Sequence, residues 1–115
     1  MIKISVDEAT AFDMLAILLL KSGRSDKGME KYENFGLEIQ TELGKDKAME
    51  VFHSEENKNL ILANKTVFAL IERITHGENI DALYVHNANM TRFYAKQELQ
   101  KRFFKSELTE LKTVR

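Results

Sequence analysis

Apolar side chains recur every three or four residues along most of this chain, and this spacing is typical of amphipathic helices. The pattern is densest in the stretch AFDMLAILLLKSG at residues 11–23, where a single aspartate, Asp13, stands among apolar residues. This stretch favours a buried helix. The carboxylate within it needs a partner, because an isolated buried charge is strongly unfavourable.

Capping residues predict where each helix begins and ends. The expected helices cover residues 6–22, 26–43, 55–76 and a last stretch from Asn79 or Asp81 to beyond Leu108, with a short helical turn at 47–53 and an extended segment at 2–4. The expected N-terminal caps are Ser5, with Glu8 completing a capping box, then Ser25 or Asp26, Asp46 and Ser54. The expected helix ends are Gly23, Gly44 and Gly77, where glycine suits a left-handed backbone.

The composition favours long helices, because proline is absent from all 115 residues. A chain of this length fits one domain, and we assign residues 1–115 to a single helical domain. The predicted fold class is all-α: an antiparallel helical bundle of three long helices with one or two short helices, in which the last helix is long. At about 30 residues that helix exceeds the usual length, so it either protrudes and pairs with a second chain or breaks.

The second predicted helix has a glycine within its expected buried face. This face consists of Met29, Tyr32, Gly36, Ile39 and Leu43. A glycine inside a helix costs about 1 kcal/mol relative to alanine. We expect Gly36 to allow the close approach of another helix, although a chance weak point gives the same pattern.

The apolar run near the N-terminus is too short to cross a membrane. Its uninterrupted part, residues 14–20, is seven residues long, whereas a membrane-spanning helix needs about 20. The run follows the acidic residues Asp7 and Glu8, whereas a secretory signal begins with basic ones. We therefore expect a cytoplasmic protein without membrane association.

No standard catalytic or metal-binding signature is present. The chain has no cysteine, and its three histidines lack metal-ligand spacing. A glycine-rich phosphate loop and a serine nucleophile elbow are also missing. We expect no metal and no cofactor, and we favour a non-enzymatic protein without excluding an enzyme.

Charge is unevenly distributed along the chain, whose overall net charge is −1. The last 24 residues contain seven basic and three acidic residues, a net charge of +4, with aromatic residues among them. Basic and aromatic side chains together can bind nucleic acid. However, the aromatic positions also suit a buried helix face and the charge density is modest, so we do not expect a nucleic-acid partner.

An asparagine lies within the expected buried face of the helix at 55–76. This face consists of Leu60, Asn64, Val67, Ile71 and Ile74. A buried amide without hydrogen-bond partners costs about 1–3 kcal/mol, so Asn64 must find them. We favour a structural role in which Asn64 fixes the alignment of neighbouring helices, and contact with a ligand is the alternative.

An arginine occupies a similar position in the last helix, on the face formed by Val85, Ala88, Arg92, Ala95 and Leu99. Asn89, Arg92 and Lys96 also form a polar stripe on this helix. We expect Asp13 to form a buried ion pair with Arg73 or Arg92, because each charge offsets the free-energy cost of burying the other. Glu72 and an incoming ligand are the other candidate anions. We favour an internal salt-bridge network. The alternatives are an anion-binding or catalytic cluster, and exposure of these charged residues through a different rotation of the helix.

Three blocks of the sequence match a known pattern. They are Phe12, Asp13, Leu15, Ile17, Leu18 and Lys21; Asn64, Val67, Phe68, Glu72, Arg73 and Ile74; and Asn89, Arg92 and Lys96. In these blocks the chain resembles an uncharacterised family of short all-helical bacterial and phage proteins, whose genes often lie near those for surface-polysaccharide synthesis. Met14, Leu19 and Phe68 depart from the family pattern, which has lysine, glutamate and tryptophan there. The resemblance implies no known activity, but it implies that Asp13, Asn64, Arg73, Asn89, Arg92 and Lys96 form one constellation.

Two functional hypotheses follow. We favour a non-enzymatic helical interaction module that forms a homodimer or a higher homo-oligomer through the first or the last long helix. The reason is that the first helix is apolar on nearly all sides and a small bundle covers only part of it. The alternative is a protein or enzyme that binds a small anionic ligand (a phosphate, sugar phosphate or nucleotide sugar) through the Asp/Arg/Asn/Lys cluster. Either activity is expected in the cytoplasm of a bacterium or of a phage-infected host cell.

Overall fold

The computed structural model describes residues 5–108, and the regular structure within them is entirely helical. The described helices are α1 (Glu8–Ser22), α2 (Asp26–Leu43), α3 (Lys45–Phe52), α4 (Glu55–Thr75) and α5 (Ala82–Phe104). The predicted all-α fold class and long last helix are confirmed, and the expected extended segment at 2–4 lies outside the described residues. Within residues 5–108, no helix is both long enough and apolar enough to cross a membrane.

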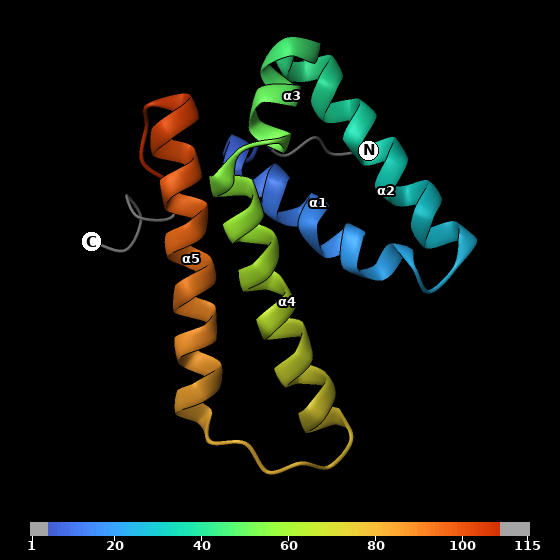
Figure 1. Cartoon of the computed structure of the whole chain (residues 1–115), viewed down its shortest axis with the longest axis vertical. Coiled ribbons are helices and arrows are strands. Elements are labelled where there is room, and N and C mark those ends of the chain that lie inside the picture. Colours follow the sequence, from blue (N-terminus) through green and yellow to red (C-terminus); the bar gives the residue numbers. More distant parts are fainter. Residues whose placement is uncertain (1–4, 109–115) are drawn as a thin grey trace.

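The longest part of the molecule is an antiparallel hairpin of α4 and α5 (Figure 1). α1 packs against one half of this hairpin and contacts both of its helices. α2 turns back from the end of α1, so that the two helices form a V (Figure 1). The short helix α3 then returns the chain from α2 to the start of α4. α2 therefore lies at the edge of the fold and packs mainly against α1 and α3.

The core lies where α1 meets the hairpin. Its fully buried large side chains include Phe12 from α1, Leu60 from α4 and Leu99 from α5. Complete burial of such a side chain contributes about 1.5–3 kcal/mol. An edge-to-face contact between Phe12 and Phe52, with ring centres 5.3 Å apart, joins α3 to this core. Because Asp13 directly follows Phe12, the same packing directs it toward the hairpin.

Two of the predicted N-terminal caps are confirmed by side-chain hydrogen bonds. Ser25 Oγ accepts from the N–H of Gly28 at 3.0 Å, and Ser54 Oγ accepts from the N–H of Asn57 at 3.1 Å. Each bond satisfies a backbone donor that has no partner within its own helix. Asp46 was expected to cap the short helix, but it lies in the first turn of α3.

The ends of α1 differ from the prediction. The residue before its first turn is Asp7, and no side-chain hydrogen bond caps the helix there, so the expected capping box at Ser5 is wrong. Gly23 has φ −73° and stays right-handed, whereas Gly44 and Gly77 have the predicted positive φ values of 85° and 88°. Glycine is therefore needed for its backbone freedom at the ends of α2 and α4, but not at the end of α1.

α2 buries much of its predicted face, because Ile39 is buried and Tyr32 and Leu43 pack against the core. Phe35, the residue before Gly36, packs against the core, and Ile39 is the buried residue of this helix. Met29 was expected to be buried and is exposed. Phe35 packs inward in preference to its neighbour Gly36, because an aromatic side chain buries more apolar surface than a glycine, which has no side chain to bury. Among residues 5–108 no helix makes the expected close approach at Gly36, and an added Cβ would find open space there.

The last helix is shorter than expected. α5 ends at Phe104, because Lys105 takes a left-handed conformation with φ 51° and stops the helical hydrogen bonding. The chain then folds back and buries Leu108 completely. At its other end the hairpin extends beyond α1 (Figure 1), and Ile71 and Ile74, which were expected to be buried, are exposed.

Candidate functional site

Asp13 forms its predicted ion pair, and the partner is Arg92. Arg92 donates from Nε to Asp13 Oδ1 at 3.0 Å and from Nη2 to Asp13 Oδ2 at 2.6 Å. A two-point contact of this kind fixes the orientation of both planar groups. The side chain of Asp13 is 4% exposed and that of Arg92 is 30% exposed. The carboxylate is therefore sealed, while the arginine side chain is partly exposed.

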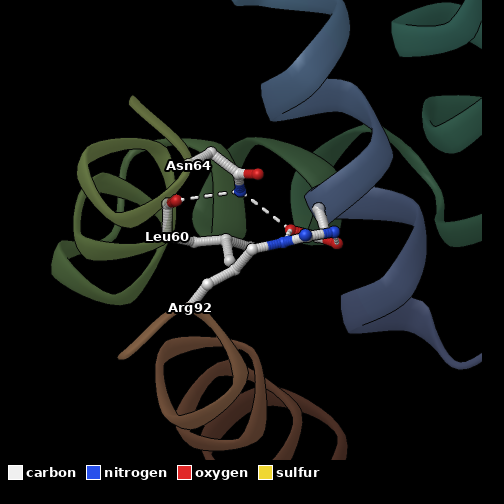
Figure 2. Close-up of polar contacts among 4 residues, drawn as sticks. Leu60, Asn64 and Arg92 are labelled. Atoms are coloured by element: carbon white, nitrogen blue, oxygen red, sulfur yellow. Dashed lines mark hydrogen bonds and ion pairs between the residues drawn. The ribbon is translucent and has the colours of Figure 1, made fainter. Parts of the chain in front are cut away.

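Asn64 adds a third helix to this contact (Figure 2). Its amide nitrogen donates to Asp13 Oδ1 at 2.8 Å and to the carbonyl oxygen of Leu60 at 3.1 Å. A side-chain amide nitrogen has two hydrogens, and both are used here. Asp13 thus accepts three hydrogen bonds, and α1, α4 and α5 meet at one carboxylate. We call Asp13, Asn64 and Arg92 the polar cluster.

Helical spacing explains why these three residues meet. Asn64 lies one turn after the buried Leu60 on α4, and Arg92 lies two turns before the buried Leu99 on α5. Residues three, four or seven apart share a helix face. The apolar neighbours therefore carry the polar groups into the core as they pack. An opposite charge and an amide then offset the cost of removing the carboxylate from water.

Asn89 and Lys96 lie beside Arg92 on α5 but outside the polar cluster. Asn89 is exposed, and its amide donates to the carbonyl oxygen of Val85 at 3.1 Å. Together with Arg92 and Phe93, they line a surface depression of about 200 Å³. This depression is large enough for a small anion, although the charge of Arg92 is already balanced by the carboxylate beneath it.

Arg73 is not brought to the polar cluster. It lies in the last turn of α4 and donates from Nε and Nη2 to the carboxylate of Glu78, at 2.8 and 2.6 Å. This contact lowers the pKa of Glu78 and raises the pKa of Arg73. The reason is distance along the helix: Asp13 faces the turn that carries Asn64, which lies about 13 Å before Arg73. Glu72, the other candidate anion, pairs instead with Arg24.

Gln100 is a buried polar residue that sequence analysis missed. It is 1% exposed, and its Oε1 accepts from the backbone N–H of Ala9 at 2.8 Å. Its amide nitrogen donates to Ser106 Oγ at 2.9 Å. Because α1 begins after Asp7, the N–H of Ala9 in its first turn has no partner within the helix, and Gln100 satisfies it. The available signal was its position next to Leu99, at the edge of the inner face of α5.

A second feature lies between the two arms of the V, and we call it the apolar groove. It has a volume of about 530 Å³. Its walls include Phe12, Leu15 and Leu19 from α1, Gly36 and Leu37 from α2, and Phe52 from α3. Glu33 and Gln40 are among the few polar residues that line it. Local sequence patterns do not predict this groove, because it depends on the angle at which α2 leaves α1.

The described residues give no indication of a bound metal. Within residues 5–108, no three His, Asp or Glu side chains lie close enough together to hold an ion. Comparison with protein-family models, curated proteins and solved structures found no match to this chain. Its function must therefore be inferred from its own residues.

Proposed function

We propose that this protein is a non-enzymatic helical interaction module that forms a homo-oligomer. The observation that carries this proposal is the apolar groove, which stays open beside the core. Leu37 on its α2 wall is 58% exposed. Contiguous apolar surface left in water is typical of interaction sites. A partner that covers the groove gains hydrophobic free energy that the single chain does not.

The polar cluster supports a structural role within such a module. Asp13 is sealed, and its two oxygens accept three hydrogen bonds from Asn64 and Arg92. A general base needs to reach the proton that it removes, and these partners occupy the carboxylate instead. The cluster holds α1, α4 and α5 in one alignment, which keeps the surfaces of α1 in a fixed geometry for docking.

Analytical ultracentrifugation of the full chain tests this proposal. We expect the weight-average sedimentation coefficient to rise reversibly from low to high micromolar concentration, because a two-fold or higher assembly forms by mass action. A strict monomer at high micromolar concentration contradicts the proposal. We also infer a site of action in the cytoplasm of a bacterium or phage-infected cell, supported by the lack of cysteine and by the family resemblance.

A second candidate function is the binding of a small anion, such as a phosphate group. The depression lined by Asn89, Arg92 and Lys96 favours it, because guanidinium, ammonium and amide groups are common partners of phosphate. Thermal-shift measurements with inorganic phosphate, nucleotides and sugar phosphates test it. A rise in Tm that is lost in Lys96→Met supports this function, and no rise with any of these compounds contradicts it.

A further inference from the structure

The α2 wall of the apolar groove has a glycine that packing within the chain does not explain. A Cβ added at Gly36 would meet no atom within 4 Å in the part of the chain that the structure describes. Gly28, on the same helix, is different, because an added Cβ there would lie 2.9 Å from the carbonyl oxygen of Lys21. Glycine is unfavourable inside a helix. A helix from a second molecule would account for its use at Gly36, since a missing side chain allows two backbones to approach closely.

The residues around Gly36 indicate which helix this is. Glu33 precedes Gly36 by three residues and Gln40 follows it by four, and all three line the groove. With a rise of 1.5 Å per residue, they lie about 4.5 and 6 Å from Gly36 in opposite directions along the axis. If two copies of α2 cross antiparallel about a two-fold axis at Gly36, Glu33 of each copy faces Gln40 of the other. A carboxylate then meets an amide donor twice, and no like charges oppose each other.

We propose that two copies of this chain associate through α2, crossing at Gly36, with Leu37 of each copy inserted into the apolar groove of the other. This inference rests on the proposed function and adds the interface and the partner. Leu37 directly follows Gly36 and is 58% exposed, and Phe12 and Phe52 are among the apolar walls that would receive it. Met29, two turns before Gly36, is 43% exposed and extends the same contact along the helix.

Sedimentation of two leucine variants tests this interface. Gly36→Leu fills the crossing point, and a Cβ added at this position meets no atom within 4 Å among the described residues. Asn34→Leu is the matched control: it adds the same side chain to α2 at an exposed position, about 200° around the helix from Gly36. We expect Gly36→Leu to weaken self-association by about tenfold or more, and Asn34→Leu to leave it unchanged.

A cysteine crosslink gives an independent measurement. The chain contains no cysteine, so Gly36→Cys introduces a single thiol. At a two-fold crossing, the two copies of this residue come within the distance of about 7 Å that a disulfide can span between Cα atoms. Under mild oxidation we expect a covalent dimer from Gly36→Cys and little from Asn34→Cys, measured by non-reducing electrophoresis.

The possible outcomes separate the two proposals. If the wild-type chain remains monomeric at high micromolar concentration, both the proposed function and this interface are contradicted. If the wild-type chain associates, but Gly36→Leu associates as tightly as Asn34→Leu, only the α2 interface is contradicted. Equal crosslinking of the two cysteine variants also contradicts the interface and leaves the proposed function standing.

Discussion

Asp13 and Arg92 lie 79 residues apart in the sequence and share two hydrogen bonds, in which the arginine alone reaches water. This difference in exposure matters, because removing either partner leaves a different group behind. Without Arg92, a sealed carboxylate retains the amide of Asn64 but loses its guanidinium. Without Asp13, the guanidinium can turn further toward solvent. The pair is therefore expected to respond unequally to substitution of its two members.

We predict that Arg92→Met destabilises the fold by about 3 kcal/mol. The value is at the lower end of the range for a broken buried ion pair, because the arginine is partly exposed and so partly screened. Methionine keeps most of the apolar length of the side chain, so the loss reports mainly on the charge. Urea denaturation followed by far-ultraviolet circular dichroism measures it as a change in the free energy of unfolding.

The control for this prediction is the opposite substitution. Asp13→Asn leaves a neutral amide in the core and an arginine that can hydrate, so we expect a smaller loss, about 1–2 kcal/mol. The double variant Asp13→Leu with Arg92→Met buries no charge and should be more stable than Arg92→Met alone. Equal losses for Arg92→Met and Asp13→Asn would contradict the unequal burial of the two partners.

The polar cluster shows how far the sequence alone determines the site. Asn64 and Arg92 were placed on inner faces because the apolar residues around them repeat at helical spacing. Asp13 was marked by its apolar neighbours. Choosing between Arg73 and Arg92 as the partner of Asp13 requires knowing which turn of α4 faces Asp13. The spacing of residues within a single helix does not give this information. The inward placement of Asp13, Asn64 and Arg92 is thus predictable from helical spacing, but their pairing is not. Arg73, Asn89 and Lys96, expected in the same constellation, lie outside the polar cluster.

The errors in the fold have related physical causes. The predicted face of α2 included Gly36, because spacing alone does not distinguish it from its neighbour Phe35, whereas packing selects the residue with the larger side chain. Local spacing predicts that Ser5 caps α1. The helix begins instead after Asp7, and the backbone N–H of Ala9 in its first turn is satisfied by Gln100, 91 residues away. Contacts between distant elements decided both cases, and local patterns do not specify them.

Two glutamines on α5 should respond in opposite ways to leucine. Gln100→Leu leaves the buried N–H of Ala9 without its acceptor, and we expect a loss of about 1–3 kcal/mol. Gln97 has a buried Oε1 without a hydrogen-bond partner among the described residues. Gln97→Leu removes that unsatisfied atom, so we expect no loss or a small gain in stability. Urea denaturation of both variants measures the difference, and equal destabilisation would contradict the hydrogen bonding described for these two residues.

Gly28→Ala is expected to destabilise the corner between α1 and α2. The new Cβ would lie 2.9 Å from the carbonyl oxygen of Lys21 and 3.3 Å from Ser25 Oγ. A backbone atom cannot move away without shifting the end of α1, and overpacking of this kind costs about 1–3 kcal/mol. Gly36→Ala is the matched control on the same helix, and the higher helix propensity of alanine should stabilise it by up to about 1 kcal/mol. Thermal denaturation at low protein concentration, where self-association does not contribute, compares the two. A Gly28→Ala variant as stable as Gly36→Ala would show that the corner has room for a side chain.

The contact between Glu78 and Arg73 predicts a dependence of stability on pH. The hydrogen bond from Arg73 lowers the pKa of Glu78 in the folded chain below its ordinary value of 4.5. The folded state therefore favours the ionised carboxylate, and the stabilisation is fully present above the ordinary pKa and is lost as the pH falls through the lowered one.

Glu78→Gln removes this contribution, so we expect it to lower Tm near neutral pH and to match the wild type in acid, below the lowered pKa. The effect should be small and should shrink with added salt, because both side chains are exposed. Glu38→Gln, on an exposed position of α2, controls for the change in net charge. Thermal denaturation of the three proteins across this pH range measures the difference. A Glu78→Gln deficit that persists in acid would mean that the carboxylate acts through its shape and not through its charge.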